Sequence, residues 1–571
     1  MGLNSSILQP EELIDFKKLA PNVSLDAVNI PEIPANRKAT NVRWLITLIA
    51  SIVILIPFLI YTMMHSDIKR LTVGYDSCGD VCGEINQHRD GVACSGQDLT
   101  TKPYIKYDDT FAGADSSTWT IKRGSCLATC PNEYLVYNGV CLKQSTIRHQ
   151  NAMKSTVDYD YENYDSQIED EDLASYYASI KWQLIISCFL SILIAMGLLI
   201  LFRFNVSFMV WAILIGSVLA LFVFAIFAWI VSQQMTVGII LSVCAVLYGI
   251  LLICFRKRVQ LVILMLKEAT KAVFRMPRLM AVPFVCFITI GIITAVCGLL
   301  TAYMLSSGTL QADAQDSHSY VMNPVMIASI VLNIVVYLWI CQFLMGIQYM
   351  IIAGAVCKWY FCRDKNVLSS PILTSAGITF KYHLGTIALG SLIILQIQIF
   401  KALLKVMMSH RWCRNIAVAC LNYFEEIFRF LSKNAYIVTA MHGQGFFQSG
   451  KRAVKLLVQN ISNVIALNFI GDFVLAVAVV IVVVISVSVS AFIFHLAPGT
   501  TYEYITMPYL IVGCVSLVAG TITFGVIEST VDTVYLCYCE DVLLNDGRNR
   551  PYFMSRALME FFEKSKKAYK K

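Results

Sequence analysis

The sequence predicts an all-α polytopic membrane protein with about ten transmembrane helices and one large loop between the first two. Three observations support this prediction. Of the 571 residues, 57% are hydrophobic and 15% are charged, whereas about a quarter of the residues in a soluble domain are charged. Several uncharged runs exceed the roughly 18 residues that mark a transmembrane helix. Basic residues gather in a few segments between these runs, as in cytosolic loops.

The chain opens with a polar tail, residues 1–43, which we expect on the cytosolic side. Its first residues, MGLNSS, fit the pattern for N-myristoylation, so Gly2 is a candidate lipidation site. The first transmembrane helix is predicted at 44–64. Pro57 lies inside this run and should kink the helix, because proline removes one backbone hydrogen bond.

The next segment, residues 65–180, is the one large soluble insert of the predicted topology. It carries 18 Asp and Glu against 10 Lys and Arg, and it holds six of the 19 cysteines: Cys78, Cys82, Cys94, Cys126, Cys130 and Cys141. Six cysteines in one acidic loop predict up to three disulfides and an extracellular position, with the pairing left open. A zinc site on Cys126 and Cys130 is the alternative. Because no histidine is near them in sequence, we expect no metal site.

Residues 181–540 form the multi-helix membrane domain of the prediction. Its expected spans are 181–202, 206–231, 235–255, 279–304, 325–356, 381–408, 415–436, 465–495 and 504–539. The basic amphipathic stretch 256–278 marks the cytosolic side, and the lysine-rich tail 541–571 needs the same side. An even number of spans, with both termini in the cytosol, places both of these basic segments on the cytosolic side.

The pair of segments between residues 381 and 436 is the least apolar part of this domain. The second of them carries Glu425, Glu426 and Arg429. We interpret the two as spans that meet near Arg411, and the alternative is a hairpin that never crosses the membrane.

The last predicted span carries two carboxylates. Glu528 and Asp532 are four residues apart, so they lie on one helix face. A carboxylate at mid-bilayer costs roughly 2.5–3.5 kcal/mol, so these groups should face a bundle interior or an aqueous path rather than lipid. There they could meet a cation or a proton, with Asp472 at the start of the preceding span as a further candidate. The alternative is a structural salt bridge or an interfacial cap.

Short motifs spread over the chain after residue 40 resemble those of the choline transporter-like (CTL) family, a solute-carrier family. They are GYD at 74–76, CG at 82–83, RKRV at 256–259, AGAV at 353–356, WYF at 359–361, RDK at 363–365, YHLGT at 382–386, NAYI at 434–437, GDF at 471–473, NDG at 545–547 and PYFM at 551–554. The resemblance implies that 181–540 is a transport domain. It also implies sodium-independent uptake of choline, often with ethanolamine, for phospholipid synthesis. Residence in the plasma membrane or a mitochondrial membrane is implied as well. The outer loop departs most from the family, because it is shorter than in well-known members.

The quaternary ammonium of choline has no N–H, so it must be held by aromatic faces or by a carboxylate. The predicted sixth span offers Trp339, Gln342 and Tyr349 near its middle, beside small residues that permit close helix approach. Further substrate-binding candidates are Trp229, Tyr248 and Glu528, and the charge-carrying candidates are Glu528, Asp532 and Asp472. For each aromatic residue the alternative is ordinary packing or a place in the interfacial belt.

The sequence carries no phosphate-binding loop, no Gly-x-Ser-x-Gly and no His-Glu-x-x-His motif, so we expect neither an enzyme nor a cofactor. The expected partners are a small-molecule substrate and the lipid bilayer, without nucleic acid. A receptor or scaffold that binds partners through 65–180 is the alternative function. Substrate preference, coupling ion, direction of transport and oligomeric state are left open.

Overall fold

The computed structural model describes residues 37–89, 92–107, 124–131, 134–137, 139–143, 168–230, 235–312, 318–365, 368, 370–408, 410–495, 506–545 and 550–561. The candidate lipidation site Gly2, the predicted N-terminal tail before residue 37, and residues 546–549 and 562–571 of the predicted C-terminal tail lie outside these residues. The chain divides into two compact units. The first comprises Met1–Leu45, Tyr176–Ile288 and Gln342–Lys571, and the second comprises Ile46–Ser175 and Thr289–Cys341.

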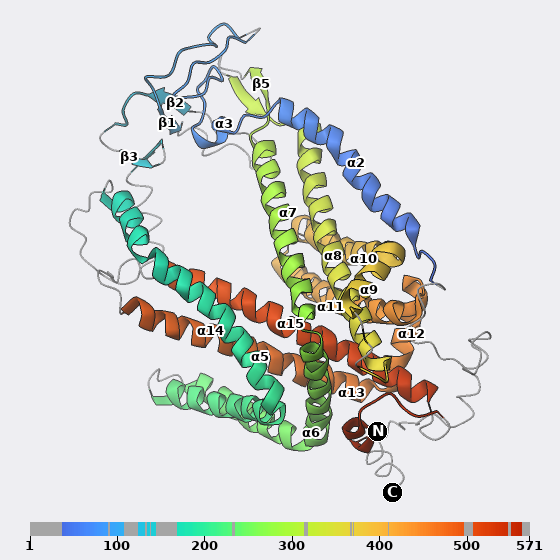
Figure 1. Cartoon of the computed structure of the whole chain (residues 1–571). Coiled ribbons are helices and arrows are strands. Elements are labelled where there is room, and N and C mark those ends of the chain that lie inside the picture. Colours follow the sequence, from blue (N-terminus) through green and yellow to red (C-terminus); the bar gives the residue numbers. More distant parts are fainter. Residues whose placement is uncertain are drawn as a thin grey trace. The chain divides into compact units, whose positions relative to one another are not determined.

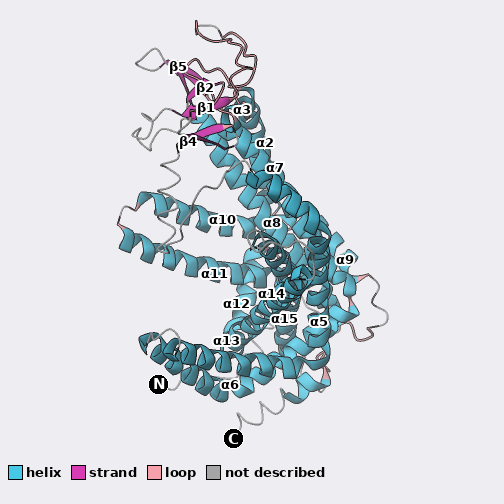
Figure 2. Ribbon diagram, turned by 90° about the vertical axis from the view of Figure 1, so that its left-hand side faces the viewer, coloured by secondary structure: helices cyan, strands magenta, loops and turns pink. Residues whose placement is uncertain are grey.

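The second unit joins long helices to a small β-rich domain within residues 65–143, which we call the outer domain after its predicted side of the membrane. It holds most of α2 (Val42–Met64), which contains Pro57, most of α7 (Ala281–Leu305) and the first half of α8 (Pro324–Phe361). After the short helix α3 (Lys69–Thr72) come β1 (Tyr104–Tyr107), β2 (Gly124–Leu127), β3 (Tyr134–Tyr137) and β4 (Val140–Lys143), in the sheet order β2-β1-β4-β3. The hairpin β5 (Thr309–Ala312) and β6 (His318–Val321) connects α7 to α8, and Figure 2 draws all strands in magenta.

Three disulfides stabilise the outer domain, and they use all six cysteines of the predicted loop. They pair Cys78 with Cys94, Cys82 with Cys126, and Cys130 with Cys141. The sequence prediction of a disulfide-containing loop between the first helix and the next spans is therefore confirmed. The widest pair, Cys82 and Cys126, spans 44 residues of chain. A small domain of four-residue strands needs such cross-links, because its apolar core is too small to hold it alone.

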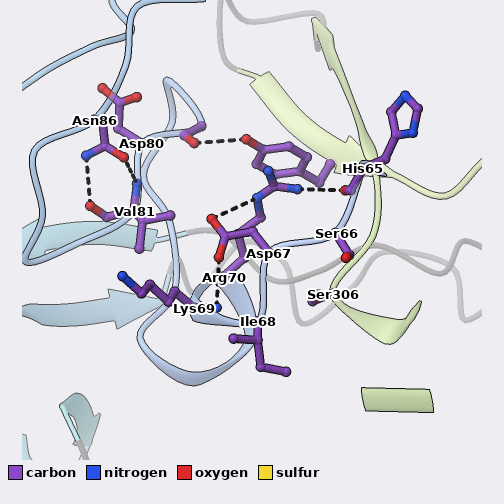
Figure 3. A network of polar contacts seen from close by, with 12 residues as sticks. His65, Ser66, Asp67, Ile68, Lys69, Arg70, Asp80, Val81, Asn86 and Ser306 are labelled. Carbon is purple, nitrogen blue, oxygen red and sulfur yellow. Dashed lines mark hydrogen bonds and ion pairs between the residues drawn. The ribbon is translucent and has the colours of Figure 1, made fainter. Parts of the chain in front are cut away.

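A network of polar contacts ties this outer domain to the β5–β6 hairpin (Figure 3). The guanidinium carbon of Arg70 lies 4.0 Å from the centre of the Tyr320 ring, and Arg70 Nη1 donates to the His65 carbonyl at 3.1 Å. The Tyr320 hydroxyl donates to the Gly79 carbonyl at 3.1 Å. On the other side, Asn86 accepts from the Val81 amide at 2.8 Å and donates to its carbonyl at 3.0 Å. The start of the loop is thus held against strand β6 of the same unit.

The first unit is a helical bundle (Figure 1). Its elements are α5 (Ile168–Ile230), α6 (Met235–Arg275), η3 (Pro277–Met280), the second half of α8, α9 (Pro371–Ile378), η4 (Thr379–His383), α10 (Leu384–Met407), α11 (Arg411–His442), α12 (Phe446–Gln459), α13 (Ile461–Ala466), η5 (Leu467–Gly471), α14 (Asp472–His495) and α15 (Thr506–Leu544). Of these, η4 and η5 are π-helical. The core is built from side chains such as Val262, Ile352 and Leu536, all fully buried.

Eight helices of the described chain are long and apolar enough to cross a membrane. One of them, α5, has non-helical backbone angles at Asn205, which lies between the predicted spans 181–202 and 206–231. Its two halves therefore correspond to two predicted spans. Helix α11, which overlaps the predicted span 415–436, is not among the eight. The all-α polytopic fold is confirmed, and α10 and α11 lie side by side as an antiparallel hairpin (Figure 2).

Small residues let α10 pack closely against its neighbours. A Cβ atom added at Gly346 of α8 would lie 2.5 Å from Ile387 Cγ2, and one added at Gly390 would lie 2.2 Å from the Tyr436 hydroxyl of α11. Neither position has room for a larger side chain. Glycine at both positions therefore sets how close α8, α10 and α11 lie, as small residues do at helix contacts in membranes.

Residues 37–41, which we call the anchor segment, pack into the first unit beside the end of α11. Arg37 is buried and donates through Nη2 to the Ala440 carbonyl at 2.6 Å. Its Nη1 lies 3.0 Å from His383 Nε2, and the Thr40 hydroxyl lies 3.0 Å from His383 Nδ1. A cation at the C-terminal end of α11 is well placed, because the last carbonyls of a helix carry partial negative charge.

Candidate functional site

Four side chains from three helices of the first unit form the charge cluster: Tyr349 of α8, Lys433 of α11, and Glu528 and Asp532 of α15. Lys433 Nζ lies 2.8 Å from Glu528 Oε1. The Tyr349 hydroxyl donates to Asp532 Oδ2 at 2.6 Å. Lys433 Nζ also lies 5.4 Å from the centre of the Tyr349 ring, so one ammonium meets both a carboxylate and an aromatic face.

The helical repeat explains how α15 presents its two carboxylates. Residues 528 and 532 are one turn apart, so both side chains project toward α8 and α11, where their partners lie. Tyr349 is buried, whereas the side chains of Lys433 and Glu528 are 40% and 38% exposed. The cluster is therefore buried at the Tyr349–Asp532 hydrogen bond and partly exposed at the Lys433–Glu528 pair.

Asp472 adds a third carboxylate near the cluster. It is the first residue of α14, directly after the π-helical turn η5, and it is exposed. It interacts electrostatically with Lys433, Glu528 and Asp532. A π-helical turn shifts the direction of the side chains that follow it and often occurs at functional sites. This part of the first unit thus contains three carboxyl groups and one lysine, which forms its ion pair with Glu528.

Lys433 is the member of the cluster that sequence reasoning missed. The signal was present, because Glu425, Arg429 and Lys433 recur every four residues and so form one polar face of α11. The sequence prediction treated that stretch as a less apolar span and named no partners for its basic residues. Their partners lie on other helices, far away in sequence.

Gln342 belongs to a second group, which we call the Glu425 cluster. Glu425 accepts hydrogen bonds from Gln398 Nε2 at 2.9 Å, Lys401 Nζ at 2.5 Å and Arg429 Nη2 at 2.8 Å. Arg429 Nη1 in turn donates to Gln342 Oε1 at 3.2 Å. The Glu425 side chain is only 11% exposed. This cluster fixes α10 and α11 to each other, and Gln342 is engaged there rather than with Tyr349.

The other aromatic candidates are not members of the charge cluster. Trp339 is buried on α8, in the part of this helix that belongs to the second unit. Trp229 is 54% exposed near the end of α5, where it packs on Gly238. Tyr248 is closer to the site, because its ring stacks edge-on against Phe473, the neighbour of Asp472, with centroids 6.2 Å apart. Of the predicted rings, Tyr349 is the one in contact with the cluster.

The described residues contain no group of three or more His, Cys, Asp and Glu side chains placed to hold a metal ion. The cluster instead combines carboxylate groups with an aromatic face, and both are groups that can hold an organic cation.

Comparison with known proteins agrees with this chemistry. The family described as "Plasma-membrane choline transporter" matches residues 239–542, a stretch that is more than half of the chain and includes every residue of the charge cluster. Choline transporter-like protein 1 of Rattus norvegicus is 26% identical over 615 aligned residues, covering 94% of this chain and 93% of its own. Choline transporter-like protein 2 of Dictyostelium discoideum is 25% identical, covering 86% of this chain and 90% of its own.

Choline transporter-like protein 3 of Homo sapiens is 24% identical over 608 residues, covering 93% of this chain and 92% of its own. The relatives therefore align along almost the whole chain, including the outer domain. The protein is a multi-pass membrane transporter and not an enzyme. It belongs to the choline transporter-like protein family.

Proposed function

We propose that the protein carries choline and related amino alcohols such as ethanolamine across the membrane, without sodium, as a supply for phospholipid synthesis. The observation that supports this most is the meeting of Glu528, Asp532 and Tyr349 at one place between α8, α11 and α15. The family match and the names of the relatives give the substrate class. The plasma membrane is the proposed location, and a mitochondrial membrane is the alternative.

The chemistry of the cluster suits a small monovalent cation. Choline needs a carboxylate at contact or longer range and a ring face within about 6 Å. The ammonium of Lys433, 5.4 Å from the Tyr349 ring centre and 2.8 Å from Glu528, occupies the kind of position that choline would need. Ethanolamine carries a primary ammonium like that of lysine, so it could also donate hydrogen bonds to Glu528. We therefore propose that both substrates use this one site.

The test is uptake of radiolabelled choline into proteoliposomes by the wild type and by Glu528→Gln, with and without a pH gradient. Glu426→Gln is the matched control, because Glu426 is an exposed carboxylate on α11 outside the cluster. Glu528→Gln removes the carboxylate that the transported cation would meet, so it should lower uptake more than tenfold, whereas the control should not.

The pH gradient distinguishes facilitated from proton-coupled transport, since only coupled uptake should follow the gradient. The proposal would be rejected if the wild type moved neither choline nor ethanolamine while the rat relative, reconstituted in parallel, moved choline. In that case the receptor alternative would make the disulfide-bonded outer domain the part to study first.

A further inference from the structure

We propose that Lys433 is a tethered substitute for the transported cation. Its ammonium occupies the site at Glu528 and Tyr349 while the carrier is empty, and the substrate displaces it. The inference rests on the proposed function, because it assigns to Lys433 a role in the transport of an organic cation through the charge cluster. It also identifies what neutralises Glu528 when no substrate is bound.

The position of the Lys433 ammonium is the first argument. It lies 2.8 Å from Glu528 Oε1 and 5.4 Å from the centre of the Tyr349 ring. A carboxylate and an aromatic face are both groups that can hold a quaternary ammonium. Lysine and substrate would therefore compete for the same carboxylate and the same ring, and both cannot be bound there at once.

Comparison with the ion pairs of Glu425 and Glu540 in the first unit is the second argument. Glu425 is 11% exposed and accepts from three different side chains, and Glu540 of α15 is fully buried against Arg452 and His442. These pairs are closed and multiply bonded, as expected of structural contacts. The Lys433–Glu528 pair has a single hydrogen bond, and both side chains are more than a third exposed. It is the pair of the three that a ligand could reach and open.

Charge balance is the third argument. Glu528 pairs with Lys433, Asp532 is hydrogen-bonded to Tyr349, whose ring faces this lysine, and Asp472 also interacts with it electrostatically. Carboxyl groups besides Glu528 would thus still attract a cation after the Lys433 ammonium has moved away. The lysine head is carried on a flexible four-carbon stem, which lets it leave and return without moving α11. Without either cation, Glu528 would remain an unpaired carboxylate within the membrane-spanning helix α15. Lys433 would thus let the empty carrier change conformation without a coupled ion.

The test separates two modes of transport by the same reconstituted protein. Net uptake into choline-free liposomes requires the empty carrier to return, whereas exchange against internal choline does not. Lys433→Met removes the charge and keeps an unbranched side chain of similar length. We expect it to lower net uptake at least tenfold, to leave exchange within about threefold of the wild type, and to lower the half-saturating choline concentration. Lys451→Met, an exposed lysine of α12, is the control and should change neither mode.

Lys433→Arg gives a second, independent readout, which also applies if Lys433→Met fails to fold. A guanidinium holds a carboxylate through two parallel hydrogen bonds, so it should be the stronger competitor. We expect the half-saturating choline concentration to rise several-fold while net uptake at saturation is kept.

Equal loss of net uptake and exchange in folded Lys433→Met would overturn the inference and make the pair structural. An unchanged half-saturating concentration in Lys433→Arg would overturn it as well. A wild type that moves choline in neither mode would instead reject the proposed function itself, and the inference with it.

Discussion

The hydroxyl of Tyr349 donates a 2.6 Å hydrogen bond to Asp532, and this bond joins the buried side of the charge cluster across α8 and α15. The same ring presents its face to the ammonium of Lys433. We therefore propose two separable functions for this residue. The hydroxyl positions the Asp532 carboxylate, and the aromatic face contacts an ammonium group.

Substitutions at Tyr349 should separate these two functions. Tyr349→Phe keeps the ring and removes the bond to Asp532, which should lower the free energy of unfolding by about 1–3 kcal/mol, as for loss of a hydrogen bond to a charged group. Tyr349→Ala removes the ring too and should weaken choline binding by a further factor of about ten or more. Thermal unfolding and choline-dependent stabilisation measure the two effects. Equal choline affinities for Phe and Ala would show that the ring face is not used.

The buried ion pairs of Glu540, near the end of α15, should contribute more to stability than the Lys433–Glu528 pair does. Glu540 is fully buried and forms an ion pair with Arg452. His442 Nε2 lies 3.3 Å from Glu540 Oε1. Glu540→Gln leaves the Arg452 charge without its carboxylate and should lower the free energy of unfolding by roughly 3–5 kcal/mol. Glu528→Gln should cost less than about 1 kcal/mol, because the Lys433–Glu528 pair is partly exposed. Denaturation of both purified variants checks the contrast, which would fail if Glu528→Gln were the less stable of the two.

The anchor segment should contribute to the stability of the first unit. Arg37→Ala leaves the Ala440 carbonyl and the end of α11 without their buried cation, so the free energy of unfolding should fall by about 1–3 kcal/mol. The neighbouring Lys38→Ala is the control, because Lys38 is exposed. Limited proteolysis with mass spectrometry would show whether cleavage near residue 37 becomes faster in the first variant only. No difference between the two variants would contradict a structural role for Arg37.

Removal of a single disulfide should destabilise the outer domain more when that disulfide closes a longer loop. Cys82–Cys126 closes 44 residues and Cys130–Cys141 closes 11. The chain-entropy estimate is about 4 and about 3 kcal/mol respectively. Paired Cys→Ser variants, followed by protease susceptibility of residues 65–143, test this order. Choline exchange per folded molecule should stay near the wild-type value, because the charge cluster belongs to the other unit. Loss of exchange in these variants would mean that transport depends on the outer domain.

Much of the fold could be predicted from sequence because the membrane imposes it. A span needs about 20 apolar residues to cross the hydrocarbon layer, so α2, α14 and α15 are visible as uncharged runs. The break at Asn205 lies between two predicted spans. The outer disulfides follow from six cysteines in one acidic loop, and the single face of Glu528 and Asp532 follows from the helical repeat. Each of these features depends on residues that are close together along the chain.

The partners of those residues depended on tertiary structure. Lys433 and Glu528 are 95 residues apart, and Tyr349 and Asp532 are 183 residues apart. The pairing of the six cysteines and the hydrogen bond from Arg429 to Gln342 also depended on tertiary structure. A periodic pattern shows which face of a helix is polar, but it does not show which other helix that face meets. That choice is made by the packing of the helices on one another, of which the close approach of α8, α10 and α11 at Gly346 and Gly390 is one example. The sequence by itself therefore determined the membrane-spanning helices and the carboxylates within them, and only the packing of those helices decided that Lys433 neutralises Glu528.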